Sequence, residues 1–254
     1  MPPRALHPVG IVLLDKPAGP SSFALVSALR RRTRARTGHA GTLDPFATGL
    51  LLLLSGAATR LAPCFVGLDK RYITDVDLTT TTSTADLDGD LLERHAAPSR
   101  TALEHALEPL RGEIDLPIPA VSAVKIGGER AYRLARRGVT VEMPVRRSSV
   151  HALDVVSTTG EDDAVTGVRL ELHVGSGTYV RAIAHALGGH CTALRRTAVG
   201  PFSVDEASAS VDEVELLEVA DVLARLPAEA LERVPVNVRA GVLALAGAHD
   251  GSAA

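Results

Sequence analysis

Asp44 is the first residue whose type and setting could do chemistry. It lies in a glycine-punctuated loop, GHAGTLDP over residues 38–45, and an apolar run follows at once. A carboxylate can act as a nucleophile or a base, and loops inserted between core elements often carry catalytic residues. An aspartate before a proline is, however, most often a turn-forming residue. Local spacing alone leaves both interpretations of Asp44 open.

Two hydrolytic chemistries can be weighed against these residues. A glycoside or nucleoside hydrolase built on Asp44 would need a second carboxylate as general acid. Asp15 and Asp75 are available, but neither forms a compelling pair with Asp44. Metal-dependent hydrolysis is weaker still, because no His/Asp cluster has ligand spacing. His39 has no further ligand nearby and, taken alone, is an ordinary loop histidine.

Arg181 is the second candidate, because it falls in the first turn of a predicted helix. The turn at residues 175–177 (GSG) leads into that helix, which Thr178 can cap. A cation in the first helical turn is disfavoured by the helix dipole. Its presence there suggests a specific partner for Arg181.

The elements that must position these residues are strands and helices in irregular order. Residues 10–14 (GIVLL) predict a buried strand, a turn follows at 15–20, and Ser21 or Ser22 can cap the next helix. That helix runs into five arginines within residues 30–36, for which solvated helix-end charges and phosphate contacts are equally good interpretations. Residues 49–55 (GLLLLLS) predict a buried central strand.

Further along, the pattern again mixes both kinds of element. Residues 72–78 and the strictly alternating residues 168–174 predict strands, and Asp88-Gly89 predicts a hairpin turn. Residues 101–111 predict a helix with a Thr101–Glu104 capping box. Strands and helices without regular alternation, joined by hairpin-like turns, indicate an α+β fold with a largely antiparallel sheet.

The charge of the chain is distributed unevenly. The formal net charge is −3, yet residues 203–254 hold ten acids and three arginines, which leaves +4 for residues 1–202. Residues 1–202 are therefore the part of the chain suited to binding a polyanion. No apolar run approaches the roughly 20 residues that span a bilayer, and the N-terminus lacks the apolar centre of a secretory signal. A cytoplasmic protein is expected, with Cys64 and Cys191 as buried free thiols.

Several stretches, in register over most of residues 10–202, resemble the TruB-type tRNA pseudouridine synthases. RTGHAGTLDPFATGLL (36–51) is similar to the catalytic motif of that family. The other matching stretches are GIVLLDKPAGPSS (10–22), KRY (70–72), SAVKIGGERAYRLARRG (122–138), GTYVRAIAHALG (177–188) and LRRTAVGPF (194–202). One such match would be weak, but six in the family's order are specific.

The resemblance implies roles for three catalytic residues. Asp44 matches the family's nucleophilic aspartate, and Arg181 matches the arginine that pairs with it, a partner that lowers a carboxyl pKa by about 1–3 units. Tyr72 matches the tyrosine that stacks on the extruded base and is implicated in removing the proton from C5. Whether the carboxylate reacts at the sugar or at the uracil ring is not determined by the sequence.

The resemblance also implies substrate-binding residues. His39 matches a histidine that contacts RNA near the flipped base, and Tyr179 matches a second aromatic of the uracil pocket. Lys16, Lys70 and Lys125 are candidate contacts to the RNA backbone, although for each one alone a solvated surface charge is an equally good interpretation.

Taken together, the expected function is isomerisation of the tRNA T-loop uridine at position 55, by a monomer without cofactor or metal. The alternative is a non-catalytic RNA-binding or tRNA-folding protein. The expected organisation is a catalytic domain over residues 1–205 and an acidic C-terminal extension over residues 206–254. Family members usually continue into a PUA-type RNA-binding domain, most of which is expected to be missing here.

Overall fold

The computed structural model describes residues 8–139 and 141–247. The residues group into two compact units, unit 1 from residues 1–70 and 195–254, and unit 2 from residues 71–194. Residues 1–7, on which the expectation about a secretory signal largely rests, lie outside the described part. The division predicted at residues 205/206 differs from this grouping and stays a prediction.

Unit 1 is built on the buried strand β3 (Thr48–Ser55), which lies between two other strands. β3 pairs antiparallel with β1 (Gly10–Lys16) over seven residue pairs and parallel with β12 (His190–Val199) at Arg195 and Arg196. β2 (Thr37–His39) adds to β3, and β13 (Phe202–Ser203) adds to β12. The apolar run of β3 is buried along its length because strands flank it on both edges and apolar side chains cover it. The predicted central strand is confirmed.

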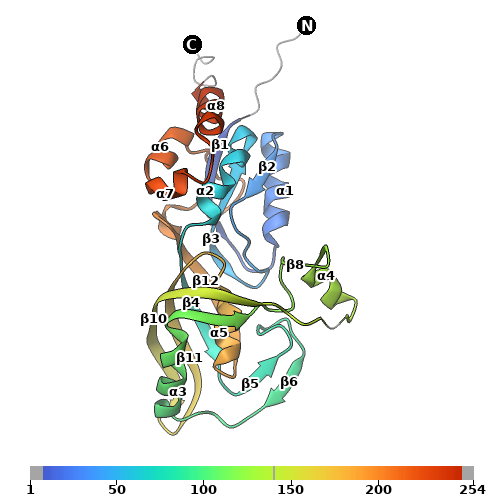
Figure 1. The fold of residues 1–254 in the computed structure, drawn as a ribbon, viewed down its shortest axis with the longest axis vertical. Coiled ribbons are helices and arrows are strands. Elements are labelled where there is room, and N and C mark those ends of the chain that lie inside the picture. The colour runs from blue at the N-terminus through green and yellow to red at the C-terminus, as the bar shows by residue number, and fades with distance from the viewer. Residues whose placement is uncertain (1–7, 140, 248–254) are drawn as a thin grey trace. The chain divides into compact units, whose positions relative to one another are not determined.

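The C-terminal helices belong to the core of unit 1. Buried side chains of the C-terminal helices, Val222 and Val242 among them, share one apolar cluster with Leu50 and Phe65. The helices α6 (Val219–Ala224) and α8 (Val236–Gly247), both labelled in Figure 1, contact each other, and α8 also contacts the 3₁₀ helix η1 (Gly56–Leu61). The helices of this unit are α1 (Ser22–Thr33), η1 (Gly56–Leu61), α2 (Ala62–Val66), η3 (Val204–Glu206), α6 (Val219–Ala224), α7 (Ala228–Leu231) and α8 (Val236–Gly247).

Unit 2 is built on four neighbouring strands in the order β4-β11-β10-β7. The long strands β10 and β11 form an antiparallel pair, and β7 pairs antiparallel with the first part of β10. On β11 the side chains of Val168, Leu170, Leu172 and Val174 are buried, which confirms the predicted alternation. The strands are β4 (Lys70–Asp77), β5 (Thr80–Thr82), β6 (Leu91–Arg94), β7 (Gly112–Pro117), β8 (Lys125–Ile126), β9 (Glu129–Arg130), β10 (Val145–Glu161) and β11 (Ala164–Val174).

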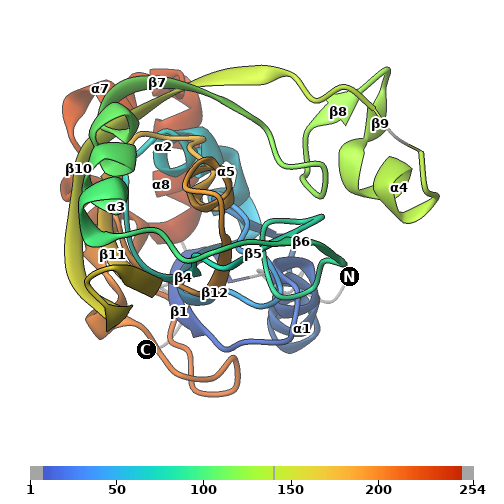
Figure 2. The same ribbon diagram turned by 90° about the horizontal axis from the view of Figure 1, so that it is seen from below.

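Two helix caps predicted from the sequence are wrong in unit 2. Helix α3 (Arg100–Leu107) is capped by Ser99, whose hydroxyl accepts from the Ala102 amide, and not by a Thr101–Glu104 box. Pro109 lacks an amide hydrogen, and the last turn continues as the 3₁₀ helix η2 (Glu108–Leu110). Helix α5 (Val180–Ala186) begins after Tyr179 without a side-chain cap, so Thr178 is not its cap. Figure 2 shows α3 beside β10 and β11.

One small lobe of unit 2 is formed by the hairpin β8–β9 and helix α4 (Ala131–Arg136). Figures 1 and 2 both show it set apart from the strands of that unit. Among the described strand pairings, all but the pairing of β12 with β3 are antiparallel. The mixed, mostly antiparallel sheet with flanking helices confirms the predicted α+β class.

Candidate active site

Asp44 is presented by the loop of residues 40–47, which we call the Asp44 loop and which joins β2 to β3 in unit 1. The Asp44 side chain is half-buried. The hydroxyl of Ser22 both donates to the Leu43 carbonyl and accepts from the Leu43 amide, each at 2.9 Å. On the other side, the Gly19 amide donates to the Pro45 carbonyl at 2.8 Å. The peptide groups on both sides of Asp44 are therefore fixed by the turn and the helix that follow β1.

Lys16 holds the second half of the Asp44 loop. Its side chain is fully buried at the end of β1. Its ammonium donates to the carbonyls of Pro17, Pro45 and Ala47 at 2.9, 3.0 and 2.6 Å. All three ammonium hydrogens are thus used inside the protein. The structure replaces the exposed phosphate contact expected for Lys16 with a contact to the backbone of the loop.

Lys70 has a similar environment. It is buried at the start of β4, and its ammonium donates to the carbonyls of Val66 and Leu68 near the end of α2. Burial lowers the pKa of Lys70 to about 8, and the nearby Arg196 lowers it as well. Burial likewise lowers the pKa of Lys16 to about 8, although the Asp44 carboxylate acts in the opposite direction. Lys16 is thus close enough to Asp44 for the two charges to interact.

We expect the free energy of unfolding to rise between about pH 8 and pH 10.5. Lys16 and Lys70 have a pKa of about 8 when folded and an ordinary value of 10.5. In that window the unfolded chain binds more protons than the folded one, so each lysine contributes about 1–2 kcal/mol at pH 9.5 relative to pH 7. Urea denaturation followed by circular dichroism at both pH values measures this rise.

The matched variants are Lys70→Met and Lys125→Met. Lys125 is exposed on β8, so its variant should keep the full rise, whereas Lys70→Met should lose about half of it. The raised pKa of the buried Cys64 thiol acts in the opposite direction near its ordinary value of 9.0, equally in both variants. An identical pH dependence in both variants would contradict the lowered pKa of Lys70.

His39 lies at the end of β2, opposite Leu53 of β3, and is half-buried. Burial and the charge of Arg196 lower the pKa of its imidazole, so the ring is neutral at pH 7. Within the part of the chain that the structure describes, its buried Nδ1 atom has no hydrogen-bond partner. A neutral ring can contact a base or a sugar, but it supplies no charge to a phosphate.

Arg196, on β12, is a residue of this site that the sequence did not single out. Its side chain is 1% exposed, and its guanidinium donates to backbone carbonyls of Gly41, Thr42 and Leu50. Its position within the predicted LRRTAVGPF stretch was visible in the sequence, but its burial was not. Adjacent Arg195 points to the other face of the strand, where it pairs with Asp15 at 2.8 Å.

In unit 2, Arg181 lies in the first turn of α5 with a buried acidic partner. Its Nη1 atom lies 3.2 Å from Oδ2 of Asp86, and the two side chains are 3% and 6% exposed. The guanidinium also donates to the carbonyls of Thr84 at 2.7 Å and Val121 at 2.8 Å. Asp86 is a partner that the sequence analysis missed, because the acidic loop of residues 79–90 reads as a surface turn. The expected pairing of Arg181 with Asp44 stays a prediction.

The remaining predicted site residues also lie in unit 2. Tyr72 is on β4 and is 8% exposed. Tyr179 is half-buried at the N-cap of α5, and Lys125 is exposed on the small lobe. Arg181 itself lines a pocket of about 250 Å³ together with His185 and Met143.

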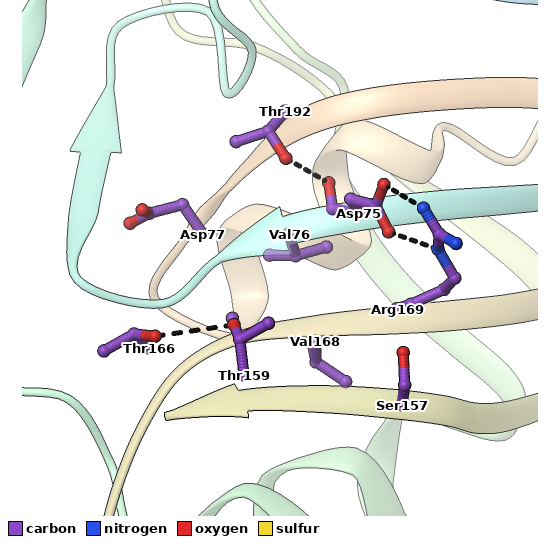
Figure 3. A pocket seen from close by; sticks show the side chains of 10 residues that line it. Asp75, Val76, Asp77, Ser157, Thr159, Thr166, Val168, Arg169 and Thr192 are labelled. Atoms are coloured by element: carbon purple, nitrogen blue, oxygen red, sulfur yellow. Dashed lines mark hydrogen bonds and ion pairs between the residues drawn. The ribbon is translucent and has the colours of Figure 1, made fainter. Parts of the chain in front are cut away.

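A larger pocket of unit 2, of about 460 Å³, contains none of the predicted site residues and is drawn in Figure 3. Arg169 donates to both oxygens of Asp75 there, at 2.6 and 2.7 Å. In unit 1, Arg195 donates to both oxygens of Asp15 at 3.0 and 2.8 Å. The two carboxylates that a hydrolase built on Asp44 could use as its second carboxyl group are thus each paired with an arginine.

Two features are absent from the residues that the structure describes, a cluster of metal-binding side chains and a membrane-spanning helix. In residues 8–139 and 141–247, no three His, Cys, Asp or Glu side chains gather closely enough to hold a metal ion. Within the same ranges, no helix has the length and apolar character needed to cross a membrane.

Residues 30–180 match the family profile of the N-terminal domain of the TruB family pseudouridylate synthases. The chain is 45% identical over 207 residues to a tRNA pseudouridine synthase B of Mycobacterium sp. (strain KMS), covering 78% of this chain and 69% of the relative. It is 46% identical over 212 residues to that of Xanthomonas campestris pv. campestris (strain B100), covering 80% and 67%.

Solved structures give the same fold. A chain of a Cbf5-Nop10-Gar1 complex superposes with a TM-score of 0.56 at 27% identity, over 78% of this chain and 50% of that chain. An archaeal box H/ACA sRNP Nop10-Cbf5 complex gives a TM-score of 0.57 at 23% identity, over 84% of this chain and 55% of that one. The present chain thus spans about half the length of these solved chains. With the family profile and relatives above 40% identity, this protein belongs to the TruB family of pseudouridylate synthases.

Proposed function

We propose that this protein converts a uridine of tRNA into pseudouridine, at the T-loop position conventionally numbered 55. Membership of the TruB family and the names of its relatives, tRNA pseudouridine synthase B, support an enzyme of this kind. The observation that carries the proposal is the setting of Asp44. Its carboxylate is half-exposed on a loop whose peptide groups are fixed on both sides by Ser22, Gly19 and Lys16.

The reaction breaks the bond between ribose C1′ and uracil N1, and it forms a bond between C1′ and uracil C5. The proton on C5 is lost, and N1 gains one, so the product is an isomer of the substrate. Asp44 is the proposed nucleophile, and both a sugar adduct and an adduct of the uracil ring fit its chemistry. The reaction is redox-neutral and intramolecular, so we propose that it requires neither cofactor nor metal.

The uridine must leave its stack before a side chain reaches C1′, which costs a few kcal/mol. We propose that Tyr72 and Tyr179 stack on the extruded base, since stacking on an aromatic ring contributes about 1–3 kcal/mol per base. Tyr72 is further proposed to take part in removing the C5 proton, and Arg181 to pair with Asp44. Neutral His39 is proposed to contact the RNA near the flipped base, and exposed Lys125 to contact a phosphate.

The test is to incubate the protein with unmodified tRNA and to map pseudouridine at single-nucleotide resolution. We expect one product, at position 55, and none in a matched tRNA carrying cytidine at that position. Binding of tRNA without product would support the RNA-binding alternative and overturn the enzymatic proposal. Product at other positions only would overturn the T-loop assignment.

The proposal includes a monomeric enzyme that acts in the cytoplasm and recognises the T-arm. Sedimentation of the protein, alone and with an isolated T-arm hairpin, tests whether it is a monomer and whether it binds the T-arm. We expect a monomer that binds the hairpin and forms pseudouridine in it. Formation of pseudouridine in full-length tRNA but not in the hairpin would place recognition outside the T-arm.

A further inference from the structure

Arg196 is an arginine whose hydrogen-bond partners in the described residues are all backbone carbonyls. Nε donates to the Leu50 carbonyl at 2.7 Å, Nη1 to Thr42 at 3.3 Å and Nη2 to Gly41 at 3.3 Å. Buried arginines usually pair with a carboxylate or a phosphate. Here the planar guanidinium of Arg196 links the start of the Asp44 loop, at Gly41 and Thr42, to the strand that follows the loop, at Leu50.

The backbone of Arg196 is held as firmly as its side chain. Arg196 pairs with Gly49 where β12 runs parallel to β3. A Cβ atom at Gly49 would lie 2.2 Å from the Arg196 carbonyl oxygen and 2.7 Å from its amide nitrogen, so only glycine allows this approach. The guanidinium therefore starts from a fixed point on the sheet and reaches the loop from there.

Arg196 and Lys16 bind opposite halves of the Asp44 loop. Arg196 holds the carbonyls of residues 41 and 42, before Asp44, and Lys16 holds those of residues 45 and 47, after it. The charge of Arg196 also acts on Lys16, His39 and Lys70, and it lowers the pKa of all three. The hydrogen bonds of Arg196 and Lys16 to four carbonyls of the loop favour one rigid arrangement of its backbone.

We propose that Arg196 is a positioning residue that fixes the backbone on the N-terminal side of Asp44 and thereby sets where the carboxylate stands. The inference rests on the proposed function, in which Asp44 is the nucleophile. A displacement of about 1 Å at a reacting group can reduce a rate about 100-fold. Because Arg196 holds the loop and not the RNA, its loss should affect the chemical step and leave tRNA binding in place.

The primary variant is Arg196→Lys, which keeps the charge but cannot reach three carbonyls lying in two directions. The matched control is Arg195→Lys on the opposite face of the same strand, where the side chain is 41% exposed. We expect the single-turnover rate constant of Arg196→Lys at saturating enzyme to fall about 10- to 100-fold. The Kd for tRNA should stay near the wild-type value, and Arg195→Lys should match wild type in both.

Amide hydrogen exchange gives a second readout that does not depend on activity. Exchange at residues 41–47 should be faster in Arg196→Lys than in wild type, while amides of β1 and α1 keep their protection. Arg196→Gln, which retains one amide donor, should show the same two effects more strongly. Circular dichroism establishes that each variant is folded.

The outcomes separate this inference from the proposed function. If wild type forms no pseudouridine, the proposed function fails. If wild type is active and folded Arg196→Lys keeps the wild-type rate, the positioning role alone is wrong. Equal losses of rate and of tRNA affinity would make Arg196 part of the RNA-binding surface instead. If neither variant folds, Arg196 serves the fold as a whole and the positioning role is again overturned.

Discussion

Replacing Asp44 with asparagine is expected to reduce the single-turnover rate of pseudouridine formation by at least about 1,000-fold. Asparagine has nearly the same shape as aspartate, so it can occupy the same place between Leu43 and Pro45. Its amide is neither a nucleophile nor a base at neutral pH. The Kd for tRNA should change by less than about 3-fold, because removing one negative charge does not weaken the attraction of a polyanion.

The matched control for this variant is Asp212→Asn. Asp212 is exposed in the same unit and lies outside the Asp44 loop, so its loss should leave rate and affinity unchanged. The rate is measured by pseudouridine formation at saturating enzyme and the affinity by filter binding. Retention of a tenth or more of the wild-type rate by Asp44→Asn would remove Asp44 from the role of nucleophile.

Replacing Asp86 with asparagine is expected to lower the free energy of unfolding by about 3 kcal/mol. Asp86 and Arg181 are both buried and lie 3.2 Å apart. Without the carboxylate, the buried guanidinium loses this charged partner, while its hydrogen bonds to the carbonyls of Thr84 and Val121 remain. The amide of Asp88 also donates to Asp86 at 3.0 Å, so the whole turn depends on this side chain.

Urea denaturation measures the loss, with Asp88→Asn as the control because its side chain is exposed. A double-mutant cycle with Asp86→Leu and Arg181→Met separates the pair from its surroundings. Removing both side chains should cost less than the sum of the single changes, because each single change already removes the interaction between Asp86 and Arg181. A loss below about 0.5 kcal/mol in Asp86→Asn, the range of ordinary surface changes, would show that the pair contributes little.

The sequence predicted the elements with strong periodic patterns. The run of leucines in β3 and the alternation in β11 correspond to buried strands as expected. The helix caps were less predictable, because Ser99 and Thr101 are both good capping residues and only the path of the chain decides between them. The positions at which helices begin and end depend on such competition between neighbouring capping residues more than the helix interiors do.

For the candidate site, short motifs pointed to Asp44, Tyr72 and Arg181, whose catalytic roles stay predictions, whereas the residues that support them were missed. Lys16 was expected at the surface, because a lysine in a turn region is usually solvated. It is buried instead because its ammonium donates to carbonyls that lie 29 and 31 residues away in the sequence. Arg196 and Asp86 were missed because their partners are distant in the chain. Arg196 donates to backbone carbonyls of residues 41, 42 and 50, and Asp86 pairs with the Arg181 guanidinium, contacts that leave no periodic signal in the sequence.

The division of unit 1 into two distant stretches has a consequence for synthesis of the chain. Unit 2 is continuous, so all of its residues are available as soon as residue 194 has been made, whereas residues 1–70 must wait for residues 195–254. At translation rates of about 5–20 residues per second, the intervening 124 residues take about 6–25 s. During this time the nascent β3 lacks β12, Arg196 and the C-terminal helices that cover it. We therefore expect its five consecutive leucines to bind a ribosome-associated chaperone during this interval.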